Sequence, residues 1–173
     1  NLQLLRPTIT FSTFDIETAL GVTGVNGAAV TTVKTYLTKA DQLARSTGSD
    51  HQETTVNDGV IVPRQLSWNG SANKWQLSLE ILTLSADGTT APFVYGTASL
   101  PALAVIASTF TGGRVKLNGT NVNCHQNITF DFGLDYRTLH HEGLIYPSTI
   151  FLNSARRTLT LTNLDPTARS TYG

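Results

Sequence analysis

The chain contains almost no cysteine, no methionine and little charge. Its 173 residues include a single cysteine, Cys124, and Lys, Arg, Asp and Glu together make up 14%. One cysteine excludes an internal disulfide framework, so packing and hydrogen bonding must stabilise the fold. The formal net charge is zero, which leaves no basic field to hold a nucleic-acid backbone. Sequence-specific nucleic-acid binding is therefore not expected.

Long apolar runs are also missing. The longest, LPALAVIA at residues 100–107, is too short to span a bilayer, and we expect no membrane partner. In place of Lys and Glu the sequence is rich in Thr and Gly, a composition typical of strands and turns rather than helices.

Motifs for catalysis or metal binding do not occur in the sequence. There is no HExxH or CxxC spacing and no G-x-S-x-G elbow. Cys124 and His125 are adjacent, so on an extended strand their side chains would point to opposite faces, and the same holds for His140 and His141. We expect no metal, no cofactor and no enzymatic activity.

Alternating apolar and polar residues predict strands that have one buried face. The pattern is clearest in TITFS at 8–12, WQLSLEI at 75–81 and NITFDFGLD at 127–135. Asn118-Gly119 predicts a tight hairpin turn, and Asn69-Gly70 predicts a second hairpin between Trp68 and Trp75. Asp131 and Asp135 are expected to be solvated residues beside a buried stripe.

Helical patterns are short. FDIETALG at 14–21 has Asp15 as a cap and Gly21 as a stop, and KADQLARST at 39–47 is a candidate for a second helix. The polar stretch 39–59 predicts one long protruding loop. The expected structure is a single domain over 1–173, an antiparallel β-sandwich or barrel with one or two short helices.

One strand pattern is written twice, near the two ends of the chain. Residues 6–15 read RPTITFSTFD and residues 156–165 read RRTLTLTNLD. Chance similarity between Thr-rich strands is one explanation. The other is mechanical, because an edge strand completed by a neighbouring subunit must obey the same pairing rules as an internal strand. The candidate assembly residues are Arg6, Thr8, Thr10, Arg156, Thr158 and Thr160.

The segment 110–166 resembles the closing half of the tail-tube proteins of long-tailed bacteriophages. The shared pattern is the Asn118-Gly119 hairpin, an alternating strand, a polar loop, Tyr146-Pro147, an Arg pair, and a Thr-rich strand that ends on Asp165. The opening RPTITFSTFDIETALG fits the same arrangement of a strand followed by a short helix.

This resemblance implies a β-sandwich whose edge strands join copies of the chain into rings, usually hexameric. The rings stack into a hollow tube that belongs to the virion and is assembled in the host cytoplasm together with other virion proteins. DNA passes through this tube without sequence-specific contacts. The long loop would then reach the adjacent ring. Its candidate residues are Asp41, Arg45, Asp50 and Glu53.

Other functions remain open at the level of sequence. A capsid decoration protein or another virion β-sandwich would share the strand pattern but not the assembly into tubes. A carbohydrate-binding or adhesin module is a different class, for which Trp68 and Trp75 would supply a sugar-stacking platform. A cross-strand pair that stabilises the hairpin is the alternative interpretation of these two residues.

Overall fold

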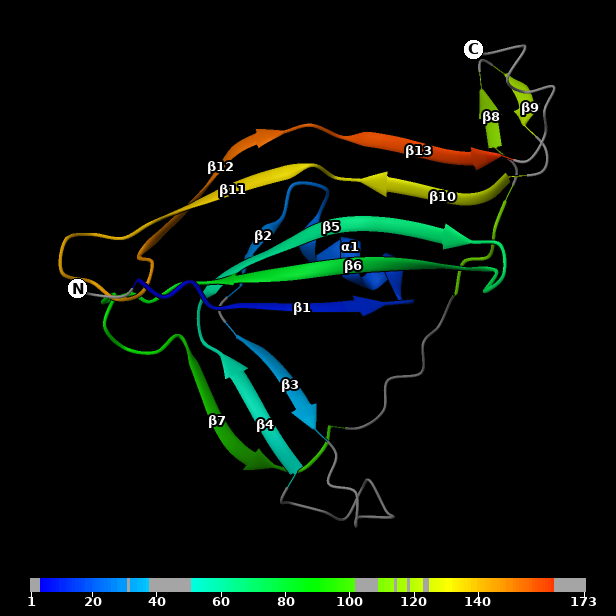
Figure 1. Ribbon diagram of the computed structural model, residues 1–173. Helices are drawn as coiled ribbons and strands as arrows, with labels where there is room; N and C mark the ends of the chain where they lie inside the picture. Colours follow the sequence, from blue (N-terminus) through cyan, green and yellow to red (C-terminus); the bar gives the residue numbers. More distant parts are fainter. Residues whose placement is uncertain are drawn as a thin grey trace.

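The protein is built almost entirely from antiparallel strands. The computed structural model describes residues 4–30, 32–37, 51–101, 109–113, 115–117, 119–122 and 125–163 (Figure 1). Within them the chain forms thirteen strands and one helix, which confirms the predicted all-β class. The closer description as a sandwich or barrel remains a prediction. In chain order the elements are β1 (Thr8–Thr13), α1 (Ile16–Thr23), β2 (Ala28–Val30), β3 (Val33–Leu37), β4 (His51–Val56), β5 (Gly59–Asn69), β6 (Lys74–Thr83), β7 (Phe93–Ala98), β8 (Val115–Leu117), β9 (Thr120–Val122), β10 (His125–Asp131), β11 (Leu134–Leu139), β12 (Thr149–Ala155) and β13 (Thr158–Asn163).

The largest sheet has six strands. Five follow the order β1-β6-β5-β10-β13, and β2 pairs with the beginning of β5 while β10 pairs with its end. Every pairing is antiparallel. The order is open, with β1 at one end and β13 at the other.

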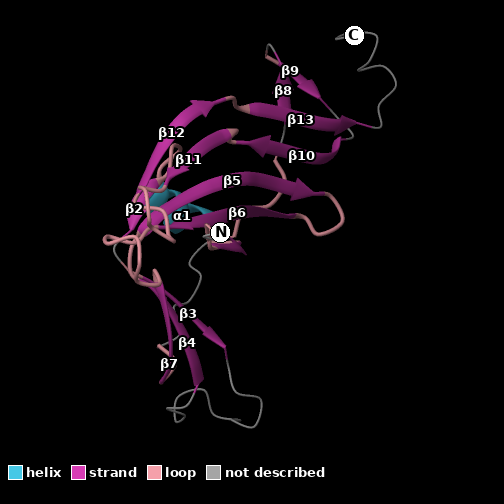
Figure 2. Cartoon of the chain, turned by 60° about the vertical axis from the view of Figure 1, so that its left-hand side comes forward, coloured by secondary structure: helices cyan, strands magenta, loops and turns pink. Residues whose placement is uncertain are grey.

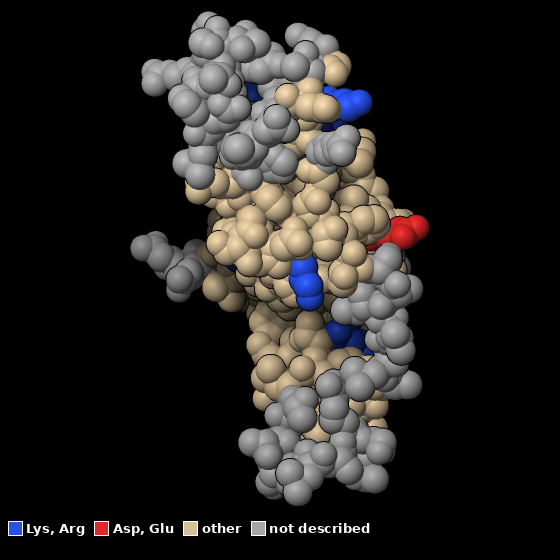
Figure 3. All heavy atoms as spheres, turned by 90° about the vertical axis from the view of Figure 1, so that its right-hand side faces the viewer, with Lys and Arg blue, Asp and Glu red and all other residues tan. Residues whose placement is uncertain are grey.

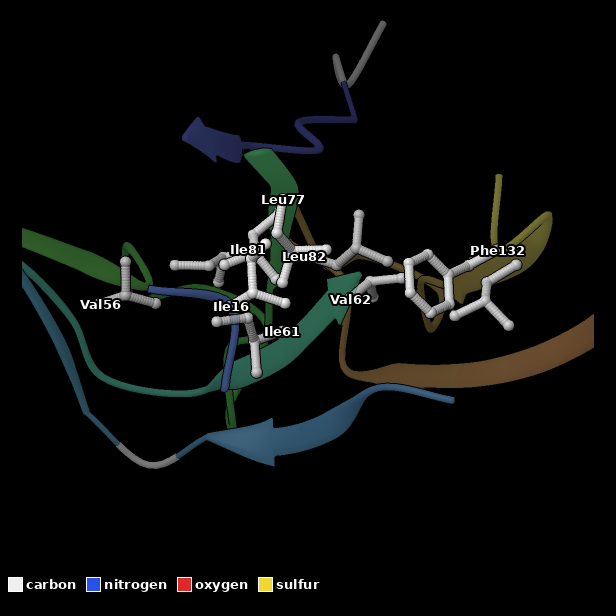
Figure 4. Packing of buried hydrophobic residues seen from close by; sticks show 10 residues of the cluster. Ile16, Val56, Ile61, Val62, Leu77, Ile81, Leu82 and Phe132 are labelled. Atoms are coloured by element: carbon white, nitrogen blue, oxygen red, sulfur yellow. The ribbon is translucent and has the colours of Figure 1, made fainter. Parts of the chain in front are cut away.

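Most of the core lies against one face of this sheet, and Val62 and Leu82 are buried on the opposite face (Figure 4). Leu77, Leu79 and Ile81 alternate along β6 and are almost completely buried. Helix α1 contributes Ile16 to the same cluster. The helix begins after Asp15, whose side chain accepts a hydrogen bond from the Thr18 backbone nitrogen, as an N-cap does. The helix predicted at 14–21 is confirmed with Asp15 as its cap, but it continues through Gly21, which was predicted to end it, and Gly24 follows its last residue as the C-cap.

Both predicted hairpins are confirmed. Strands β5 and β6 form the first, in which Trp68 is paired directly with Trp75. Strands β8 and β9 form the second, and Gly119 adopts a φ of +81°, the left-handed conformation that such a turn requires.

The C-terminal strands form a long hairpin that is interrupted halfway. Strand β10 pairs with β13, and β11 pairs with β12. The regular pairing is interrupted at Gly133, between β10 and β11, and at Arg156, between β12 and β13. The Gly133 carbonyl accepts a hydrogen bond of 2.9 Å from the Arg156 nitrogen. The alternating pattern of 127–135 therefore forms the end of one strand and the start of another.

A separate three-stranded sheet, in the order β3-β4-β7, projects away from the main sheet (Figures 1 and 2). It corrects the expectation of one loop over 39–59, because residues 51–56 form β4 and Gly59 begins β5. The β-branched run Thr54, Thr55 and Val56 is suited to a strand and pairs with neighbours on both sides. The helix predicted at 39–47 lies outside the described residues.

Candidate assembly surface

The two copies of the repeated pattern lie at the two opposite edges of the main sheet. Thr8 and Thr10 belong to β1, and Thr158 and Thr160 belong to β13. All four side chains are exposed, as are those of Arg6 and Arg156 just before each strand. The sequence predicted the two strands but gave no sign that one sheet would separate them by three others.

The two edge strands run in the same direction. Four antiparallel pairings lie between them, from β1 to β6, β5, β10 and β13, and each pairing reverses the direction. The sheet therefore has two ends of similar sequence and equal direction, one on each side.

Within the two edge strands few of the devices occur that usually prevent pairing with another chain, although Arg6 and Pro7 precede β1, Arg156 precedes β13, and the β10–β13 pairing is irregular at Thr162. Such edges are commonly protected by charged side chains, proline or a bulge. The strand segments TITFST and TLTLTN contain no charged residue and no proline. Strand β1 also pairs with β6 over all six residues without a bulge. Among the described residues no further strand pairs with the outer side of β1 or of β13.

Where the end of β1 and the start of β13 lie level in the sheet, one row across it is polar and the next is mainly apolar; the rows of Thr8 and Thr10 instead include the buried residues Leu82 and Val62. In the first row the paired residues are Ser12, Ser78, Gln65, Asp131 and Thr158. In the next row they are Thr13, Leu77, Leu66, Phe130 and Leu159. Adjacent rows point to opposite faces, so each edge presents hydroxyl groups on one face and mainly apolar side chains on the other. Leu159, at the β13 edge, is 57% exposed.

Charge is sparse on the polar face and mostly neutralised. Arg64 pairs with Glu80 and also donates to the Leu134 carbonyl oxygen. Asp135 accepts a 2.8 Å hydrogen bond from Asn153 and lies beside Arg137, and both contacts hold the pKa of its carboxyl below the usual range. Figure 3 shows the same scarcity from one side, where most of the described surface carries no charge. The sequence analysis predicted that Asp131 and Asp135 are solvated, but it did not predict that Asn153 and Arg137 contact Asp135.

Glu53, predicted as part of a loop that reaches another ring, lies instead in β4. Its carboxylate accepts hydrogen bonds from Lys34 at 3.0 Å, from Thr55 at 3.1 Å and from the Tyr36 hydroxyl. The bonds from Lys34 and Tyr36 lower the pKa of Glu53, and the same carboxylate raises the pKa of both donors. No local pattern indicates that residues 33–37 pair with residues 52–56, so the sequence analysis missed this cluster. Of the other residues assigned to that loop, Asp41, Arg45 and Asp50 lie outside the described residues.

The tryptophan pair is not arranged as a sugar-stacking platform. Trp68 is only 8% exposed. A side chain at Gly112 would overlap its indole ring, so the 109–113 segment packs directly on it. Trp75 donates its backbone N–H to the Phe110 carbonyl oxygen at 2.9 Å, which fastens the same segment over the hairpin. Trp68 is therefore part of the packing, whereas Trp75 is half-buried and lines an apolar pocket with Leu66 and Phe110.

Two other kinds of site, a metal centre and a membrane-spanning helix, receive no support from the described part of the chain. Among the described residues no three His, Cys, Asp or Glu side chains are grouped as metal ligands would be. No described helix has the length and apolar character needed to cross a membrane. In comparisons with known proteins, no family model, curated protein or solved structure matches this chain. The two open sheet edges are therefore the feature on which a functional interpretation depends.

Proposed function

We propose that the protein is a structural subunit that assembles with copies of itself, edge strand to edge strand, into a tube. The observation that carries this proposal is the presence of two edge strands of similar sequence, with no charged residue inside either strand, on opposite sides of one described sheet. A subunit with two such edges can bind a copy on each side, and a chain of these contacts closes into a ring or continues as a filament.

The apolar face at the β13 edge supports the same proposal. Leu159 is mostly exposed, although its row continues into the fully buried Leu77 of the core. A strand added beside β13 would cover Leu159 and pair the outward backbone N–H and C=O groups of that edge.

The resemblance to tail-tube proteins supplies the biological setting. On this proposal the rings are hexameric, stack in the tail of a bacteriophage virion, associate with other virion proteins, and let DNA pass through the channel. The sheet β3-β4-β7, which projects from the body and contains Glu53, would contact the next ring (Figure 2).

The proposal is tested by charging both edges. The double variant Thr10→Lys/Thr160→Lys places an ammonium group on each edge strand, at exposed positions where the subunit itself loses no packing. The control is Gln65→Lys, which adds the same charge at an exposed position in the middle of the sheet. Negative-stain electron microscopy and sedimentation velocity are measured over a wide range of protein concentration.

We expect the unmodified protein and the Gln65→Lys variant to form rings or tubes, and the double variant to remain a folded monomer. Tubes of the double variant, or an unmodified protein that stays monomeric at every concentration, would overturn the proposal. A monomer that binds immobilised glycans would support the carbohydrate-binding alternative.

A further inference from the structure

The strand order restricts how copies can be joined. If β13 of one copy pairs with β1 of the next and the sheet continues, the two strands run parallel, because both point the same way within each copy. A two-fold contact would instead pair β1 with β1, or β13 with β13, in antiparallel orientation. Only the first arrangement uses both edges in one repeated contact.

The register within the sheet shows that β1 and β13 are staggered. Ser12 of β1 and Thr158 of β13 share a row, although the sequence repeat aligns Ser12 with Thr162. Strand β13 therefore starts about where β1 ends, displaced by four residues along the strand direction. At about 3.3 Å per residue this displacement is roughly 13 Å.

The stagger decides which register between copies gives a useful contact. If the rows simply continued from one copy to the next, only residues 12–13 would lie beside residues 158–159. Sliding the neighbour by four residues brings Thr8 beside Thr158 and pairs all six residues of both strands. Because four is an even number, the slide keeps hydroxyl groups beside hydroxyl groups and apolar side chains beside apolar side chains.

The same slide sets the angle of the strands in a closed ring. Each copy adds five strands to the continuous sheet, which is about 24 Å perpendicular to the strands at the usual strand spacing. It also adds the stagger of about 13 Å along the strand direction. Neighbours related by rotation alone then have strands inclined about 30° to the ring axis. Closed barrels need a comparable inclination, typically about 35–45°. The register that pairs all six residues of both strands is therefore compatible with a closed ring of inclined strands.

On this basis, and resting on the proposed self-assembly, we propose that copies join head to tail in parallel, with β13 against β1 of the next copy in the register of the sequence repeat. Thr8 then lies beside Thr158, and Thr10 beside Thr160, across the contact. The partner of each edge is a second copy of this chain, and the wall is one continuous, inclined sheet.

Disulfide cross-linking tests orientation and register together. In a Cys124→Ser background, the single variants Thr8→Cys, Ser12→Cys, Thr158→Cys and Thr162→Cys are mixed in pairs, with an affinity tag on one member. The mixtures are assembled, oxidised mildly and separated on a non-reducing gel. All four positions are exposed, and a disulfide forms only where two Cα atoms come within about 7 Å.

We expect links between positions 8 and 158 and between 12 and 162, and none from Gln65→Cys, the control in the middle of the sheet. Links between 8 and 162 together with 12 and 158 would show an antiparallel contact, and a link between 12 and 158 alone would show the unshifted register. Links between two β1 positions or two β13 positions would show a two-fold contact. Each of these three results overturns the parallel register while leaving self-assembly standing, whereas no assembly at all would overturn both proposals.

Discussion

Replacing Leu159 with alanine should weaken assembly while leaving the isolated subunit almost as stable as before. Leu159 is 57% exposed in the subunit and would be covered by the neighbouring β1. Complete burial of a leucine side chain contributes about 1.5–3 kcal/mol, so covering the exposed part contributes about 1 kcal/mol beyond what alanine would. That difference lowers the association constant of each contact about fivefold.

The matched control is Leu139→Ala. Leu139 is 50% exposed and lies on β11, which is not an edge of the main sheet. The two variants remove the same atoms at similar exposure, so any difference between them reports position alone.

The assay is sedimentation of assembled material as a function of total protein, together with thermal unfolding of the unassembled subunit. We expect Leu159→Ala to raise the concentration at half-assembly at least fivefold, and both variants to unfold within a few degrees of the unmodified protein. Equal effects of the two variants on assembly would refute the reasoning that places Leu159 in the contact.

Three further changes test other contacts. Gly133→Ala should lower the free energy of unfolding by at least about 2 kcal/mol in denaturant titrations, because φ is +57° there and the new methyl group would overlap the Arg156 carbonyl oxygen. The control is Gly119→Ala, where φ is also positive but no atom lies near the new methyl group, and this change should lower the free energy of unfolding by about 1 kcal/mol. Asp87 accepts hydrogen bonds from Thr90, Thr89 and Ser85, which lower the pKa of its carboxyl, so its stabilisation is complete above about pH 5 and is lost progressively as the pH falls below that value. The melting temperature of Asp87→Asn should therefore lie below that of the unmodified protein at pH 7, and the gap should be narrower at pH 3. The proposed register also brings Arg6 beside Arg156, so Arg6→Gln should lower the concentration at half-assembly at low salt and have little effect at high salt, where the repulsion is screened.

Local patterns predicted the local structure well. Alternation in TITFST and WQLSLEI located β1 and β6, and Asn118-Gly119 located the β8–β9 turn, because the strand period and turn geometry are written in neighbouring residues. The cap at Asp15 likewise located helix α1.

Strand β4 shows where this reasoning failed. The segment HQETTV looks like a polar loop when it is considered alone. Its carboxylate, on Glu53, accepts hydrogen bonds from Lys34 and Tyr36 on the neighbouring strand, and these partners are distant in sequence. The run of Thr54, Thr55 and Val56 was the signal that favoured a strand, and the surrounding polar residues outweighed it.

The placement of the candidate assembly strands could be predicted only in part. The repeated pattern identified Thr10 and Thr160 as residues of similar strands, but the order β1-β6-β5-β10-β13 depends on pairings between segments far apart in the chain. The equal direction and four-residue stagger of the two edges follow from that order and from the register, neither of which a local pattern contains.

The most direct test of complementary edges is a mixing experiment with two single variants. Thr10→Lys blocks β1 and leaves β13 open, and Thr160→Lys does the reverse. We predict that each variant alone stays monomeric in sedimentation velocity, whereas an equal mixture forms a dimer containing one copy of each and grows no further. Dimers of either variant alone, or a mixture that remains monomeric while the unmodified protein assembles, would contradict the account.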